Sequence, residues 1–365
     1  MKILVNYLGK TNSGPIIAYE MAKGFANCGH DVSVLLSTEV SNKEQWLSFQ
    51  GFKKVVFIET YNTKIQFAMR SIKMIFGLKR YLLKKFHNEK FDVILNPMHH
   101  LWSTFVCNCF SGARVITVCH DPISHEGENG IETHLTKKLM KMSDDIIVLS
   151  RKFIPIIKNK YNLDEEHIFY MEHGLLETYR NCAKYNEDPV YKDGNWNFLF
   201  FGRIEEYKGV NILIEAFNKL SHDRNDVYLY ILGKGDIKYP YESESRIILR
   251  NGYIPDEEIA QYFDNDRVIV VLPYISASQS GVVAIAADFM NVVIASDVGG
   301  LSEQLMDGKV GIFVKPNDSD SLYKAMSDII NNCTEIERQK KLMKEFRNRL
   351  QWSTIVNQLN EELFK

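Results

Sequence analysis

Short apolar runs alternate with helix-like segments along almost all of the 365 residues. Residues 2–6 form the first apolar run. Gly14 then precedes a segment with helical spacing that begins with Pro15, a residue suited to a first helical turn. Further apolar runs of strand length follow at 31–36, 55–58, 93–96, 115–119, 145–149 and 168–171. Because parallel strands need a long crossover that is usually a helix, this alternation predicts parallel sheets covered by helices.

The same alternation restarts after a polar stretch between residues 177 and 197, which we interpret as an interdomain linker. New apolar runs lie at 196–201, 227–232, 247–251, 268–272, 292–295 and 311–314. A chain of this length also exceeds what one hydrophobic core usually holds. We therefore predict two Rossmann-like, doubly wound α/β domains facing each other across a cleft. The expected domains are 1–180 and 190–350, and a polar helix at 353–365 could pack back on the first domain.

Charge and cysteine content argue against several classes of function. The formal net charge of −2 gives no global attraction to nucleic acid, so no nucleic-acid partner is expected. The six cysteines form no CxxC pair and no cysteine/histidine spacing of a metal site. No apolar run reaches the roughly 18 residues of a spanning helix, and the first five residues are expected to form a buried strand rather than a signal peptide. We expect a reduced cytoplasmic protein without a transmembrane anchor.

Two cations follow the apolar run at 198–201. Gly202 and Arg203 come directly after this run, and Lys208 with Gly209 begins the next helix-like segment. At such a junction of a strand end and a helix N-terminus, free backbone N–H groups and the helix dipole favour negative charge. Two fixed cations suit a diphosphate better than a monoanion. A lone Arg/Lys pair is usually a solvated surface, but the strand–glycine–helix context favours an anion site.

Two further loops of the second half also follow apolar runs. Gly233 comes after 227–232 and permits close approach of a backbone or a ligand. Tyr253 and Ile254 come after 247–251, where a nucleotide base could lie against them. The alternative for each loop is only a tight turn.

The loops after 268–272 and 292–295 are rich in small residues. The first loop leads into a helix whose residues Ser280, Gly281 and Val282 would direct N–H groups at an anion. The second loop contains Gly299 and leads to Glu303. In a parallel sheet all these loops share one edge, so one nucleotide-sized ligand explains them together, whereas unrelated turns explain them singly.

The first half offers weaker candidates for a site. His120 follows the run 115–119, where a catalytic and a structural role are equally supported, and His99 and His100 are weaker still. Gly14 could let a substrate approach the backbone, or could simply begin a helix.

Neither half contains G-x-G-x-x-G, which argues against a nicotinamide or flavin dehydrogenase. Asp264-x-Asp266 is similar to the metal-binding DxD of some sugar transferases, but its place before a strand favours a solvated turn.

With these residues, the chain resembles the family 4 glycosyltransferases over nearly its whole length, most specifically in the second half. The resemblance lies in Gly202-Arg203…Lys208-Gly209…Leu213-Ile214-Glu215-Ala216-Phe217, in the block from Val293 through Gly299-Gly300 and Glu303 to Pro316, and in the N-terminal glycine loop that leads to Gly29-His30. It implies a GT-B fold with the nucleotide sugar in the C-terminal domain and the acceptor in the N-terminal domain. It also implies retention of anomeric configuration without a metal or other cofactor.

The resemblance implies a role for each matching residue. Arg203 and Lys208 would hold the donor diphosphate, and fixed cations aimed at a developing charge can replace a metal. Gly14 would lie beside the phosphates or the donor sugar, and His120 would face the reacting sugar. Tyr253 and Ile254 would flank the base.

One departure concerns two glutamates. The family usually carries E-x7-E, and without gaps these positions hold Ala277 and Ile285. The loop resembles a variant branch with S-x-x-Q-S-G-V, in which Gln279 and Ser280 occupy the loop. Asp288 could substitute only if the register shifts. The missing glutamates suggest an alternative to an active glycosyltransferase, namely a nucleotide-sugar-binding subunit with weak catalysis. A second alternative function is a GT-B sugar-nucleotide epimerase.

Residues 63–87 form a basic amphipathic stretch without an acid. Such a stretch could lie on anionic lipid, or could be an ordinary helix with one core face and one solvated face.

We predict a retaining glycosyltransferase of cell-surface polysaccharides such as O-antigen or capsule. It would use a nucleoside-diphosphate sugar and a glycan acceptor, which could be lipid-linked, at the inner face of the cell membrane.

Overall fold

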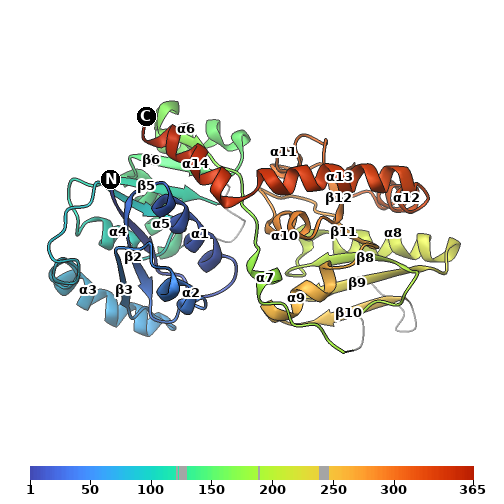
Figure 1. The fold of residues 1–365 in the computed structure, drawn as a ribbon, viewed down its shortest axis with the longest axis horizontal. Helices are drawn as coiled ribbons and strands as arrows, with labels where there is room; N and C mark the ends of the chain where they lie inside the picture. Colours follow the sequence, from blue (N-terminus) through green and yellow to red (C-terminus); the bar gives the residue numbers. More distant parts are fainter. Residues whose placement is uncertain (121, 123–129, 188–189, 238–245) are drawn as a thin grey trace. The chain divides into compact units, whose positions relative to one another are not determined.

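The structure is a computed structural model that describes residues 1–365 except 121, 123–129, 188–189 and 238–245 (Figure 1). The chain divides into two compact units. The N-terminal unit comprises Met1–Glu172 and Trp352–Lys365, and the C-terminal unit comprises His173–Gln351. Each unit contains one fully parallel sheet, which confirms the predicted α/β class. Among the described residues, no helix combines the length and apolar character needed to cross a bilayer.

The N-terminal unit is built on a seven-stranded sheet in the order β3-β2-β1-β4-β5-β6-β7. Its strands are β1 (Lys2–Tyr7), β2 (Asp31–Ser37), β3 (Lys54–Ile58), β4 (Val93–Asn96), β5 (Arg114–Cys119), β6 (Asp145–Val148) and β7 (Ile168–Tyr170). Most of their residues are buried, including all of β4 and β6, because helices cover both faces of a parallel sheet, whereas the edge strands β3 and β7 are less buried. The order reverses between β1 and β4, as in a doubly wound fold.

Helices from both ends of the chain pack on this sheet. They are α1 (Gly14–Asn27), α2 (Lys43–Ser48), α3 (Lys64–Lys85), α4 (Ser103–Cys107), α5 (Ile131–Met142), α6 (Ile154–Tyr161) and the C-terminal α14 (Trp352–Leu363). Helix α14 packs against α1, and Arg114 of β5 donates a hydrogen bond of 2.9 Å to the Leu363 carbonyl. The last helix of the chain therefore belongs to the unit that contains the first strand.

The C-terminal unit is built on a six-stranded sheet in the order β10-β9-β8-β11-β12-β13. Its strands are β8 (Trp196–Phe201), β9 (Val227–Gly233), β10 (Ile247–Asn251), β11 (Val268–Leu272), β12 (Val292–Ser296) and β13 (Ile312–Val314). Its helices are α7 (Thr178–Asn181), α8 (Val210–Asp223), α9 (Asp256–Phe263), α10 (Gly281–Phe289), α11 (Leu301–Gln304), α12 (Ser319–Ile330) and α13 (Cys333–Arg349). Figure 1 shows α12 running beside α13, and α12 also packs on α8.

The polar stretch 177–197, predicted as a linker, is packed into the C-terminal unit where it is described. It contains α7, and Tyr191 is buried with its hydroxyl donating to the Tyr262 carbonyl at 2.6 Å. Tyr191 also stacks edge-to-face on Tyr230. Polar composition alone does not reveal such a single aromatic anchor, which explains the difference from the prediction.

Candidate functional site

The loops after β8, β9, β11 and β12 lie along one edge of the C-terminal sheet, because all its strands are parallel. Main-chain hydrogen bonds join these loops in pairs. The Ile204 N–H donates to Lys234 O at 2.8 Å, the Ile275 N–H to Tyr207 O at 2.7 Å, and the Gly300 N–H to Ala277 O at 3.4 Å. We call this row of joined loops the rim. The rim is held by backbone contacts and is therefore ordered before any ligand binds.

The Lys208 ammonium group reaches from the β8 loop to Tyr274 in the β11 loop. Its Nζ donates to the Tyr274 hydroxyl at 3.2 Å and lies 4.7 Å from the centre of the Tyr274 ring. Its loop is pressed against the β11 loop, because a Cβ on Gly209 would lie only 1.9 Å from the Pro273 carbonyl oxygen. Gly209 also has a φ of +67°, so two constraints require glycine there. The lysine is thus positioned by the backbone of its own loop and by Tyr274.

Tyr274 connects this lysine to the start of α10. Its side chain is buried, and its hydroxyl lies 3.1 Å from Ser280 Oγ. Ser280 Oγ in turn accepts the Val282 N–H at 3.3 Å and caps the helix. A cation, a buried hydroxyl and a capped helix N-terminus therefore form one connected chain.

Gln304 of α11 forms two hydrogen bonds with the main chain of Ser280. The Ser280 N–H donates to Gln304 Oε1 at 2.9 Å, and Gln304 Nε2 donates to Ser280 O at 2.9 Å. Glu303, the predicted contact residue, is the half-buried neighbour of this glutamine. Sequence reasoning missed both Gln304 and Tyr274, and no motif marks either residue as a contact.

The predicted N–H donors of the α10 loop have different partners. The N–H groups of Ser280 and Val282 bind Gln304 and Ser280 Oγ, as described above. Of the three predicted donors, the Gly281 N–H is the one without an acceptor among the described residues. Gln279 is half-buried, and its Oε1 is enclosed without a hydrogen-bond partner in the described part of the chain.

Arg203 lies at the outer side of the rim. Its side chain is 73% exposed, and its Nη1 lies 2.8 Å from a carboxylate oxygen of Glu205. The preceding Gly202 lies directly under the Lys208 ammonium, because a Cβ there would be 3.3 Å from Nζ. The two predicted diphosphate ligands therefore start from the same loop, but Arg203 is paired with an acid.

Gly233 serves the protein's own packing. With a φ of +146°, it lies so close to the β8 loop that a Cβ would be 1.7 Å from the Gly202 carbonyl oxygen.

Tyr253 is 70% exposed and donates from its hydroxyl to Asp256 at 3.0 Å, whereas the Ile254 side chain is buried. A planar ligand could therefore stack on Tyr253 but not on the Ile254 side chain.

The structure also shows whether a nearby acid could replace the family glutamate that is missing at Ile285. Ile285 is buried within α10, and the next acid, Asp288, is fully buried at the other end of that helix. Asp288 binds Arg347 at 3.0 Å and Arg180 at 3.4 Å. Asp288 is therefore committed to structural ion pairs and does not replace the missing glutamate.

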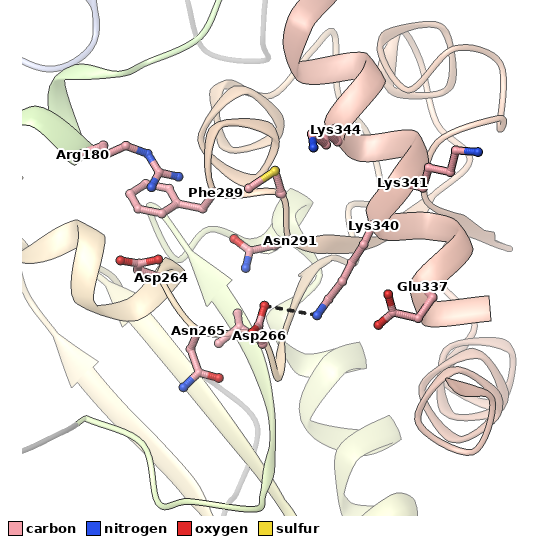
Figure 2. Close-up of a pocket in the computed structure, with 12 residues that line it drawn as sticks. Arg180, Asp264, Asn265, Asp266, Phe289, Asn291, Glu337, Lys340, Lys341 and Lys344 are labelled. Carbon is pink, nitrogen blue, oxygen red and sulfur yellow. Dashed lines mark hydrogen bonds and ion pairs between the residues drawn. The ribbon is translucent and has the colours of Figure 1, made fainter. Parts of the chain in front are cut away.

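Asp264 and Asp266 line a pocket of about 430 Å³ beside the first residue of β11 (Figure 2). Asp264 accepts the Tyr185 hydroxyl at 2.6 Å, and Asp266 pairs with Lys340 at 3.2 Å. The rim loops leave the opposite ends of the strands. Both carboxylates thus have protein partners at an edge away from the rim.

Two predicted site residues belong to the N-terminal unit. His120 donates from Nε2 to the Pro97 carbonyl at 2.8 Å. Gly14 begins α1, and a Cβ there would lie 2.6 Å from the Tyr7 hydroxyl oxygen, so its lack of a side chain is required by packing. His100, a weaker candidate, accepts the Trp102 N–H, and burial lowers the pKa of its imidazole to about 3.

The sequence matches two profiles of one glycosyltransferase group. Residues 16–175 match Glycosyltransferase Family 4, and residues 196–332 match Glycosyl transferases group 1. Together these matches cover most of the chain and include the Lys208 loop, Tyr274 and Gln304.

Individual relatives and structures agree with these matches. An uncharacterized glycosyltransferase of Methanocaldococcus jannaschii is 26% identical over 63% of this chain and 62% of its own length, so the alignment covers less than two thirds of that relative. The O-antigen chain mannosyltransferase C of Escherichia coli is 27% identical over 70% of each chain. The Anabaena protein HepE, solved with UDP and glucose, has a TM-score of 0.69 at 16% identity, covering 100% of this chain and 99% of HepE.

The structural similarity confirms the predicted GT-B fold, and the profile matches confirm the predicted enzyme class. The parallel sheet with an ordered rim, the lysine held at a helix N-terminus and the two profile matches lead to one conclusion. This chain is a glycosyltransferase of group 1, in family 4.

Proposed function

We propose that this enzyme transfers a sugar from a nucleoside-diphosphate sugar to a glycan acceptor, with retention of anomeric configuration and without a metal ion. The observation that carries the proposal is the Lys208 ammonium, held by the Tyr274 hydroxyl beside the capped N-terminus of α10. A fixed cation next to a helix N-terminus suits a diphosphate.

The chemistry follows from where charge develops. Breaking the bond between the sugar and the diphosphate builds negative charge on the leaving oxygen. Lys208 and the Gly281 N–H would stabilise that charge without rearranging, because both are positioned before the ligand binds. Arg203 would exchange its pair with Glu205 for the diphosphate.

The loss of both family glutamates leaves this phosphate site intact. Ala277 contributes its carbonyl to the rim, and Ile285 contributes to the core of α10. In the described part of the chain, neither residue is a side-chain hydrogen-bond partner of Lys208, Tyr274 or Ser280. We therefore favour transfer over the rival binding-subunit function.

The test of the proposal is product analysis with EDTA present. The enzyme is incubated with a panel of nucleoside-diphosphate sugars and oligosaccharide acceptors, and NMR reports the anomeric configuration of the product. We expect a glycosidic product that keeps the donor configuration. An inverted product contradicts retention, and a product formed only after a divalent metal is added contradicts metal independence. A sugar-nucleotide isomer formed without any acceptor would favour the epimerase.

The acceptor part of the proposal rests on α3, which has two apolar faces. Leu78 and Leu82 are buried in the core of the N-terminal unit. A different face carries Ile65, Met69, Ile72 and Phe76, spaced for a single helical stripe, and these side chains are 74%, 63%, 60% and 86% exposed. Four large apolar side chains in one exposed stripe are unusual on a protein surface that faces only water.

Basic residues accompany the apolar stripe. The exposed cations Lys79, Arg80, Lys84 and Lys85 follow Phe76 on α3. Near an anionic lipid surface each would contribute about 1 kcal/mol of attraction. We propose that the stripe docks on an anionic membrane, where a lipid-linked acceptor would be found.

Flotation with liposomes tests this docking. We expect wild type to float with anionic vesicles and less with neutral ones, and Phe76→Ser with Ile72→Ser to lose most of the anionic binding. The control is Leu47→Ser, since Leu47 is 53% exposed on α2, outside the stripe. Equal flotation of wild type and the double variant contradicts the membrane proposal and leaves the donor proposal standing.

A further inference from the structure

His173 supplies an unused polar atom close to the rim. The residue belongs to the C-terminal unit and is 6% exposed. Its Nδ1 lies 2.8 Å from the Gly174 carbonyl oxygen, and because a carbonyl only accepts, Nδ1 carries the proton. Burial lowers the pKa of this imidazole, so the ring stays neutral and Nε2 keeps a lone pair.

The Nε2 atom lies beside the first residue of α10. A Cβ placed on Gly281 would be 3.9 Å from Nε2, and as glycine the residue leaves that space free of a side chain. Within the described part of the chain Nε2 has no hydrogen-bond partner. The His173 side chain is thus more than nine-tenths buried with one ring nitrogen that no described donor binds, and this nitrogen lies next to a helix N-terminus suited to phosphate.

Because Nε2 can only accept a hydrogen bond, it favours a ligand group that donates one. A phosphate oxygen would be repelled by Nε2, whereas a hydroxyl group would donate to it. In a nucleotide sugar the 2-hydroxyl is one carbon from the carbon that carries the phosphate oxygen. The ribose 3′- and 2′-hydroxyls are two and three carbons from the carbon that carries the phosphate oxygen, so the sugar 2-hydroxyl is the nearer donor.

We propose that His173 Nε2 accepts a hydrogen bond from the 2-hydroxyl of the donor sugar while the N-terminus of α10 holds the diphosphate. The inference rests on the proposed nucleotide-sugar donor and adds a residue that binds the sugar. It also supplies an acceptor beside the N-terminus of α10, near the chain segment where Ala277 and Ile285 stand at the family's glutamate positions.

The test compares two ligands on two variants of the full chain. Isothermal titration measures binding of the nucleotide sugar that the enzyme uses and of its nucleoside diphosphate. We expect His173→Phe to weaken nucleotide-sugar binding about five- to tenfold, as for one lost hydrogen bond, and to leave diphosphate binding within twofold. His173→Gln, which keeps an acceptor, should recover part of the loss. The matched control is His222→Phe, an exposed histidine on α8.

A second arm changes the ligand instead of the protein in its main comparison, which protects the test against misfolding of the variant. On wild type, the 2-deoxy analogue of the nucleotide sugar should bind about five- to tenfold more weakly than the parent sugar, and His173→Phe should bind both equally. Equal weakening of sugar and diphosphate by His173→Phe overturns the inference, and so does an undiminished affinity for the 2-deoxy analogue. If wild type binds no nucleotide or nucleotide sugar, the proposed function itself fails.

Discussion

At the residue scale, a single hydroxyl group links the two parts of the proposed phosphate site. The Tyr274 hydroxyl lies within hydrogen-bond distance of Lys208 Nζ and of Ser280 Oγ. We expect Tyr274→Phe to weaken binding of a nucleoside diphosphate about three- to tenfold, because the ammonium loses its anchor while the ring still fills the core. Isothermal titration measures the change. Tyr185→Phe, which removes a hydroxyl beside Asp264, is the control, and equal affinities for both variants would contradict the role.

Glu205 offers a change in the opposite direction. Its carboxylate pairs with the exposed guanidinium of Arg203 and therefore competes with an anionic ligand. We expect Glu205→Gln to strengthen diphosphate binding about two- to fivefold at low salt, with the gain shrinking at high salt as the charges are screened. Titrations at two salt concentrations check this. An affinity unchanged at low salt would show that Arg203 does not reach the ligand.

At the element scale, α10 has a different task at each end. Its N-terminus is capped by Ser280 and adjoins the proposed phosphate site, whereas Asp288 near its C-terminal end binds Arg180 and Arg347. One helix thereby connects the rim to α7 and α13. The stability of this anchor determines how firmly the N-terminus is held.

We expect Asp288→Ala to lower the free energy of unfolding by about 2–4 kcal/mol, because it removes a fully buried carboxylate that pairs with both Arg180 and Arg347. Thermal and urea denaturation measure the loss. Asp297→Ala, at an exposed carboxylate after β12, should change stability by less than about 0.5 kcal/mol. Equal stability of the two variants would contradict the anchoring role.

The elements themselves were readable from the sequence, and the contacts between them were not. Apolar runs marked the strands, and the glycine–arginine–lysine junction marked the rim. Gln304 and Tyr274 were missed because each makes its contact across a loop, after the sheet has brought distant segments together. Ile254 was expected to contact a base, but its apolar side chain packs inward, a choice that a turn motif does not encode.

At the scale of the whole molecule, the chain ends in the unit where it began. Helix α14 packs on α1 so closely that a Cβ on Gly24 would lie 2.8 Å from the Val356 side chain. Cys28 and His30, just after α1, also bind Asn357 and Asn360 of α14. The N-terminal unit is therefore completed only by the last segment of the chain.

We expect Gly24→Val to destabilise the N-terminal unit by about 1–3 kcal/mol, because the added methyl groups overlap Val356 and push α14 away from α1. Limited proteolysis should then cut near Gln351 faster than in wild type. Gly77→Ala is the control, because a Cβ there meets nothing within 4 Å. Unaltered proteolysis of Gly24→Val would show that α14 does not depend on this contact.

The most direct test of the central claim measures donor binding by Lys208→Ala. In buffer with EDTA, wild type is titrated with nucleoside diphosphates and their sugars, beside Lys208→Ala and the control Lys234→Ala, which changes another rim lysine. We expect wild type and Lys234→Ala to bind one nucleotide sugar, and Lys208→Ala to bind it at least about tenfold more weakly with its fold intact, because one charge-assisted contact to the diphosphate is lost. Binding and sugar transfer by Lys208→Ala at wild-type levels would contradict the assigned phosphate site.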